Sequence, residues 1–96
     1  MSPNNRVKLN KLRNKLDKID NDLLKIIKIR SNFVKEVLKL KNSKSEIVDN
    51  KRINFILKKI KKKSLQNNID PQVTQRIWKS MIWSYIAFEQ RNFKKK

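Results

Sequence analysis

The stretch LNKLRNKLDKIDNDLLKIIKIRSNFVKEVLKLK, residues 9–41, decides the fold of this chain. Apolar residues recur along it at intervals of three and four, a spacing typical of one buried helix face. The series consists of Leu9, Leu12, Leu16, Ile19, Leu23, Ile26, Phe33, Val37 and Leu40, and Arg30 stands within it. A buried guanidinium keeps its charge and requires an anionic partner. Arg30 therefore indicates either an ion pair inside a core or a pocket for an acidic ligand.

The pattern of the whole chain predicts an all-α fold of three helices in a single domain, residues 1–96. We expect the helices over about residues 7–41, 48–63 and 70–93, the last with Asp70 as its cap and Pro71 in its first turn. The first helix would be roughly 50 Å long, well beyond a compact domain of this size. Its apolar face therefore needs a cover besides the two shorter helices, and a second copy of the chain is the simplest cover.

The composition excludes several kinds of chemistry. The chain has no Cys, His or Gly, which argues against thiol and histidine catalysis, the usual zinc sites and glycine-rich phosphate loops. We therefore expect neither a cofactor nor a metal. No stretch is apolar enough for a membrane span, and the N-terminal MSPNNRVK lacks the apolar core of a signal peptide, so we expect a cytoplasmic protein.

The formal net charge of +18 has two interpretations. It is typical of proteins that bind polyanions, and a basic helical module that binds nucleic acid without catalysis is one hypothesis. The other interpretation is compositional, because Lys, Asn and Ile share AT-rich codons. The first hypothesis does not explain Arg30, and binding that weakens steeply with salt in a gel-shift titration would support it.

Two further cations lie on the same predicted helix as Arg30. Lys41 follows eleven residues later and returns to within about 20° of the same face, so a small dianion could bridge Lys41 and Arg30. Arg13 lies about 25 Å from Arg30 along one helix, too far for one small ligand, but an antiparallel second copy could bring it close. Each cation could equally be a solvated charge, a helix-end cation or a partner in a structural ion pair.

The other two predicted helices contribute further candidates. Arg52 begins the second helix, with Asp49 three residues upstream. In the third helix an apolar stripe that includes Tyr85 ends at Glu89. A carboxyl buried among apolar groups tends to hold its proton and can then donate a hydrogen bond. Glu89 could instead be exposed near the helix end.

These residues together resemble the all-helical AroQ class of chorismate mutases, over nearly the whole chain. Arg13, the pair Ile19-Asp20, Arg30 and Lys41 match the family pattern of the first helix without a gap. Arg52 falls on the arginine of the second helix and Glu89 on its Gln-or-Glu position in the third. The segment MIWSYIAFEQRNF, residues 81–93, is similar to a proteobacterial branch that includes the isochorismate pyruvate lyases.

The resemblance implies an intertwined helical homodimer with two shared active sites. Each site would take Arg13 from one chain, and Arg30, Lys41, Arg52 and Glu89 from the other. The family reaction is the Claisen rearrangement of chorismate to prephenate on the way to phenylalanine and tyrosine, and it needs no metal or cofactor. Lys41 and a protonated Glu89 would donate to the ether oxygen, and Asp49 would accept from the ring hydroxyl. A glutamic acid at this position implies a rate that falls as pH rises.

Two positions depart from the commoner family pattern. Ile53 stands where some relatives have a Glu after the second-helix arginine, and Tyr85 stands where some have a small polar residue. Both changes resemble the lyase branch. Isochorismate pyruvate lyase, which forms salicylate, therefore remains the alternative enzyme, and an assay with each substrate separates the two.

Overall fold

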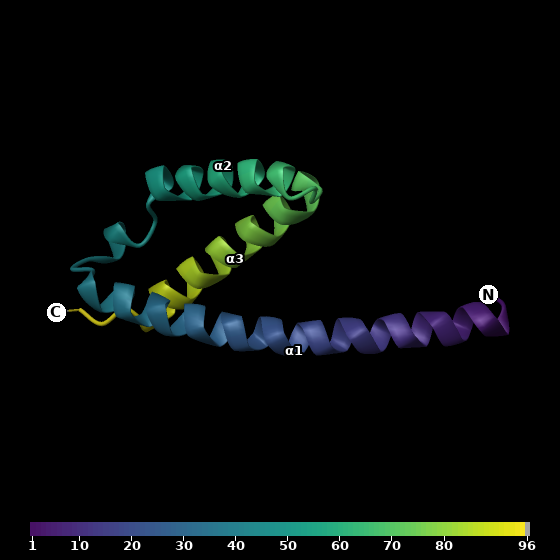
Figure 1. Ribbon diagram of the computed structural model, residues 1–96. Helices are drawn as coiled ribbons and strands as arrows, with labels where there is room; N and C mark the ends of the chain where they lie inside the picture. Colours follow the sequence, from purple (N-terminus) through teal and green to yellow (C-terminus); the bar gives the residue numbers. More distant parts are fainter. Residues whose placement is uncertain (96) are drawn as a thin grey trace. The chain divides into compact units, whose positions relative to one another are not determined.

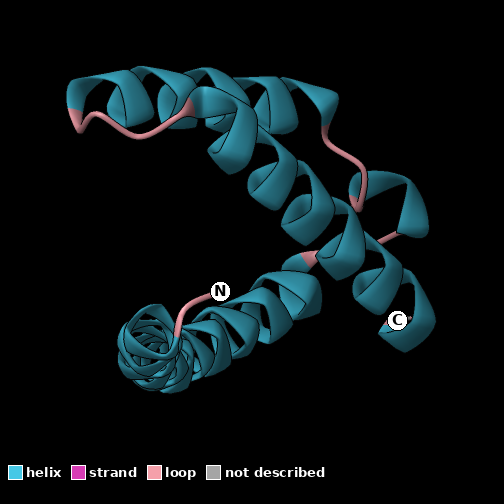
Figure 2. Cartoon of the chain, turned by 90° about the vertical axis from the view of Figure 1, so that its right-hand side faces the viewer, coloured by secondary structure: helices cyan, strands magenta, loops and turns pink. Residues whose placement is uncertain are grey.

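In the computed structural model, which describes residues 1–95, three helices follow one another along the chain (Figure 1). They are α1 (Pro3–Leu40), α2 (Asn50–Gln66) and α3 (Pro71–Asn92), with a short 3₁₀ helix η1 (Lys44–Glu46) between the first two. Figure 2 shows only helix and loop over the described residues. The predicted all-α class is confirmed. None of the helices in this part of the chain combines the length and the apolar character that crossing a bilayer requires.

The chain forms two compact units, and α1 belongs to both of them. The first unit is Met1–Phe33, and the second begins at Val34. The first unit is therefore helix over almost all its length, whereas the second holds the last two turns of α1 together with η1, α2 and α3. That residues 1–96 act as a single domain stays a prediction.

The helix α1 begins at Pro3, earlier than the residue 7 expected from the apolar spacing. Ser2 caps it, because the Ser2 hydroxyl accepts a hydrogen bond from the backbone N–H of Asn5 at 3.2 Å. Proline at the first helical position costs no hydrogen bond and has the helical φ already set. The Ser2-Pro3 pair is thus the start signal, and an apolar periodicity that begins at Leu9 does not detect it.

The apolar face of α1 is exposed in the chain. No residue of this helix is buried, and Leu16, Ile26 and Phe33 expose 57%, 60% and 67% of their surface. Burial of the face, which the spacing predicts, is not found within one chain. An apolar face of this length is unusual on a solvated surface and marks an interaction site.

The core lies in the second unit. Ile47, Ile82 and Ile86 are its buried apolar residues, with 3%, 7% and 7% of their surface exposed. Partly buried apolar residues from every element around them complete the cluster, namely Leu38, Val48, Ile53, Ile56, Leu57 and Phe93. Leu38 thus anchors the end of α1 against α2 and α3, which fixes where the chain leaves that helix.

The turn between α2 and α3 closes without a glycine. Asn68 adopts a left-handed conformation with φ of 56°, which asparagine tolerates better than most residues. The N–H of Ile69 donates to the carbonyl of Ser64 at 2.9 Å, and the N–H of Asn68 to the carbonyl of Leu65 at 3.4 Å. This is the Schellman pattern, which satisfies the last carbonyls of a helix. Asp70 then accepts from the N–H of Gln72 and caps α3.

Polar contacts fix α2 against α3, which meet at the turn between them and diverge away from it (Figure 1). Ser64 and Thr74 are buried, and their hydroxyl oxygens lie 2.7 Å apart. The Gln75 side chain donates to the carbonyl of Leu57 at 2.9 Å. The Ser64 hydroxyl also bonds back to the carbonyl of Ile60. The helix α2 continues to Gln66, whereas the sequence predicts an end near residue 63. Its start shifts likewise, from near Val48 to Asn50.

Candidate active site

A partly buried ion pair joins the residue that follows α1 to the end of α3. Lys41 Nζ lies 2.6 Å from Glu89 Oε2, and the two side chains expose only 18% and 9% of their surface. A charge-assisted hydrogen bond is strong in such a position, because little water competes for either group. The structure therefore places a cationic donor and a carboxyl together at one point, the two residues for which direct catalytic roles are expected.

Local structure holds each member of this pair. Lys41 directly follows α1, and its backbone N–H donates to the carbonyl of Leu38 at 3.1 Å, so the anchored Leu38 sets the position of Lys41. Glu89 lies on α3 one turn after Tyr85 and three residues after Ile86. Residues four apart share a helix face, so Tyr85 and Glu89 face the same side. Tyr85 is half-buried.

The candidates on α2 lie at its N-terminus. Asp49 caps the helix, and its Oδ1 accepts a hydrogen bond from the backbone N–H of Arg52 at 3.0 Å. Arg52 is exposed, and its guanidinium carbon lies 5.3 Å from the centre of the Phe55 ring, in cation–π contact. Asp49 thus has a structural role that the family resemblance does not imply, and its second carboxylate oxygen can still accept a hydrogen bond.

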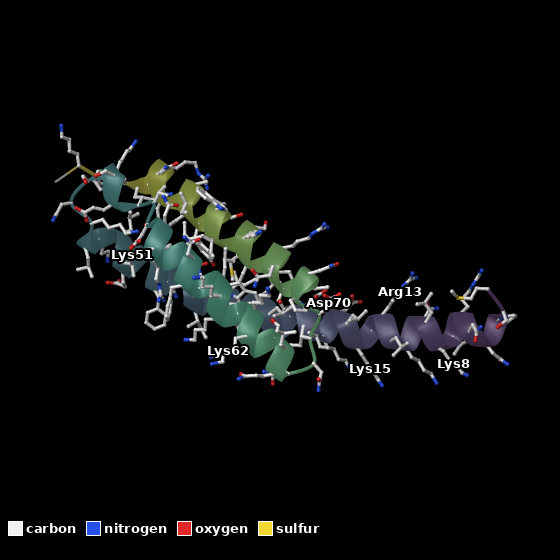
Figure 3. All side chains as sticks on the ribbon, turned by 90° about the horizontal axis from the view of Figure 1, so that it is seen from above. Lys8, Arg13, Lys15, Lys51, Lys62 and Asp70 are labelled. Carbon is white, nitrogen blue, oxygen red and sulfur yellow. The ribbon has the colours of Figure 1, made fainter. Side chains whose placement is uncertain are left out.

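Arg13 and Arg30 belong to the first unit, and both lie on α1. Arg13 is exposed and projects outward from the helix (Figure 3), whereas Arg30 is half-buried. Their separation along the helix is about 25 Å, so the two guanidinium groups of one chain do not reach one small ligand. Arg30 is flanked along its face by the exposed Ile26 and Phe33.

The sequence predicted only part of the roles of Lys41, Glu89 and Asp49 in these contacts. It placed Lys41 and Glu89 at one site as parallel donors, but not as partners of each other. No periodicity within a helix predicts a contact between two residues that lie 48 positions apart in different elements. The capping role of Asp49 was detectable, because aspartate directly before an apolar helix is a recognised start signal.

Replacing Asp49 tests its capping role. We expect Asp49→Ala to lower the free energy of unfolding by about 1 kcal/mol, because the N–H of Arg52 loses its partner. Asp49→Asn keeps a capping oxygen and is expected to change it by only a few tenths of a kcal/mol. Urea unfolding followed by circular dichroism measures both. Equal stability of the alanine and asparagine variants would contradict the capping role.

The site offers cations and hydrogen-bond donors rather than metal ligands. Over residues 1–95 no group of three or more acidic side chains could hold a metal ion. No buried side-chain nitrogen or oxygen in that range lacks a hydrogen-bond partner. An arrangement of this kind can bind an anion and stabilise negative charge that develops during a reaction.

Comparison with known proteins gives two matches. Residues 12–90 match the model of a family described as chorismate mutase type II. The chain is also 34% identical over 76 residues to a protein from Methanocaldococcus jannaschii named chorismate mutase, and the match covers 78% of this chain and 77% of the relative. No solved structure matches significantly. The matched range includes all seven candidate residues, from Arg13 to Glu89.

Proposed function

The chain belongs to the chorismate mutase type II family, and on that basis we propose that it converts chorismate to prephenate. In this rearrangement the ether C–O bond breaks while a new C–C bond forms within the same molecule. No atom, proton or electron enters or leaves. The protein therefore has to supply binding, orientation and stabilisation of charge, which agrees with a chain that lacks Cys and His.

The first step is to hold the flexible substrate in the reactive conformation. Chorismate carries two carboxylates, and guanidinium groups bind carboxylates through two parallel hydrogen bonds. We assign this role to Arg30 of one chain and to Arg13 of a second copy. The distance of about 25 Å between these residues within one helix supports a contribution from two chains. Fixing the substrate in this way lowers the barrier by removing conformational freedom before the reaction.

A homodimer is part of this proposal. The apolar face of α1 is exposed in the single chain, with Leu12, Leu16, Ile19 and Leu23 each exposing about half of their surface. Covering such a face with the same face of another copy would remove it from water, at a gain of roughly 25 cal/mol for each Å². The same association would bring Arg13 of one copy to the substrate of the other. We further propose that residues 1–96 work as one domain in the cytoplasm.

Lys41 and Glu89 act on the breaking bond. Negative charge builds up on the ether oxygen as the C–O bond lengthens, so a donor placed there stabilises the transition state more than the substrate. The 2.6 Å contact between Lys41 Nζ and Glu89 Oε2 supports a shared task for the two side chains. Lys41 donates through its ammonium group. Glu89 accepts from Lys41 as a carboxylate, and it adds a second donor only as a carboxylic acid released from that ion pair.

The remaining candidates complete the site. Arg52 adds positive potential near the substrate carboxylates, and its contact with Phe55 restrains its direction. The carboxylate oxygen of Asp49 that does not cap α2 can accept a hydrogen bond from the ring hydroxyl of the substrate. Tyr85 lies one turn from Glu89 and would line the substrate pocket. The similarity of residues 81–93 to the lyase branch, together with Ile53 and Tyr85, makes isochorismate the second substrate to consider.

The observation that supports this function most is the family match over residues 12–90. The direct test incubates the purified chain with chorismate and, separately, with isochorismate. Loss of chorismate absorbance with formation of prephenate is the expected result. Salicylate and pyruvate from isochorismate, without prephenate from chorismate, would assign the chain to the lyase activity. Turnover of neither substrate would refute the proposal.

A further inference from the structure

A cavity beside the proposed catalytic pair has no role in the function described above. Its volume is about 420 Å³, and it lies between the last turns of α1, the end of α3 and the residues that follow α3. All its lining residues belong to the second unit. Cavities of roughly 300 to 1,000 Å³ hold small organic molecules in proteins. This cavity is therefore large enough for a small-molecule ligand.

The lining combines apolar side chains with several lysines. Leu38 and Phe88 are half-buried and supply the apolar surface, and Asn92 contributes an amide. Four exposed lysines complete the lining, namely Lys35, Lys39, Lys94 and Lys95. Lysine stems extend this apolar surface while their ammonium groups stay in water. A ligand that fits this lining has an apolar body and a negative charge.

The nearby carboxylates do not neutralise these cations. Glu36 pairs with Lys39 at 3.3 Å, but both side chains are about 70% exposed, so the pair is weak and can rearrange. Glu89, which follows Phe88 in sequence, is bound to Lys41. Within residues 1–95 no ion pair involves Lys35, Lys94 or Lys95. Among the described residues, at least three positive charges at the cavity thus have no carboxylate partner.

The cavity is separate from the substrate site. Consecutive residues of a helix point about 100° apart, so Phe88 lines a different side of α3 from Glu89. None of the seven residues assigned to substrate or catalysis lines it. The two sites share one backbone contact, because Leu38 lines the cavity and its carbonyl accepts the hydrogen bond of the Lys41 N–H.

We propose that this cavity is a second binding site, for a small organic anion with an apolar body, such as an aromatic carboxylate. The apolar side chains supply hydrophobic contact, and the lysines supply selectivity for the charge. The site does not depend on the proposed function, because neither the cavity nor its lysines take part in the rearrangement.

The test measures 2-naphthoate binding to the full chain by titration calorimetry at low salt. Two control probes separate the charge of 2-naphthoate from its ring: acetate has the charge without the ring, and 2-naphthamide has the ring without the charge. We expect measurable binding of 2-naphthoate and no measurable binding of either control probe. Equal affinity for 2-naphthamide, or no binding of 2-naphthoate at millimolar concentration, would overturn the proposal.

Variants then locate the site. Lys35→Gln combined with Lys39→Gln is expected to weaken 2-naphthoate binding about fivefold, whereas arginine at both positions is expected to preserve it. Lys58→Gln with Lys62→Gln removes the same charge from the exposed side of α2, where Figure 3 labels Lys62, and is expected to change nothing. Arg30→Ala is expected to retain binding. Loss of binding in Arg30→Ala, with no effect of the Lys35 and Lys39 changes, would assign the anion to the substrate site and overturn the proposal.

Discussion

Replacing Arg30 by alanine is expected to lower kcat/KM for chorismate by at least about 10³-fold, because a carboxylate of the substrate loses its fixed charged partner. Arg30→Lys keeps the charge but loses the bidentate hydrogen-bonding geometry of the guanidinium, so an intermediate loss of kcat/KM is expected. Steady-state kinetics on purified protein measures both. The matched control is Arg6→Ala, which removes an exposed arginine from the same helix. Near-normal turnover by Arg30→Ala would show that the assigned clamp is wrong.

Mixing two inactive variants tests whether the site is shared between chains. Arg13→Ala and Arg30→Ala are each expected to be nearly inactive. In a mixed dimer, both changes fall in one site and the other site is intact. After unfolding and refolding the two together, about a quarter of the normal activity is expected, because half of the dimers are mixed and each has one working site. No recovery, in a mixture shown to contain mixed dimers, would place both arginines in a site built from one chain.

Lys41→Ala is expected to lower kcat by about 10² to 10³, the usual cost of losing one donor to a developing oxyanion. KM is expected to change much less, because the donor acts mainly in the transition state. Lys44→Ala removes an exposed lysine three residues further on and serves as the control. A rise in KM at unchanged kcat would mean that Lys41 binds the substrate without acting on the bond that breaks.

The same substitution leaves the buried Glu89 without its partner, so folding has to be monitored separately. Breaking a buried pair on one side costs more stability than removing both charges. The double variant Lys41→Met with Glu89→Gln is therefore expected to unfold at higher urea concentration than Lys41→Ala. If Lys41→Ala and the double variant both remain folded under assay conditions and both turn over slowly, the decrease in kcat is caused by the lost donor and not by unfolding.

The existence of the three helices was predictable from their apolar spacing, and the start of α3 from the Asp70-Pro71 pair. Details that depend on single polar side chains were harder to predict. The hydroxyl of Ser64 bonds to Ile60 and Thr74, and this bonding makes a polar residue part of the buried surface of α2. Asn68 makes a left-handed turn that would ordinarily be expected at a glycine. In both cases the local sequence is compatible with several conformations, and the packing of α2 against α3 selects one.

The candidate site was predictable in its membership but not in its contacts. The resemblance named Lys41 and Glu89, yet their ion pair depends on how the core around Ile82 and Ile86 brings α3 to the end of α1. The cavity next to them was not anticipated. Its lysines look like ordinary solvated charges in the sequence, and only the folded chain brings Lys35 and Lys94 to one opening.

The division of α1 between two units has a consequence for amide hydrogen exchange. Backbone amides near Ile82 and Ile86 are shielded by a core, whereas those of Met1–Phe33 depend on hydrogen bonds within a helix whose apolar side faces water. Exchange in the first 33 residues should therefore slow as protein concentration increases, while exchange in α3 changes much less. The N-terminal amides would thus report directly on how much of the protein has found a second copy.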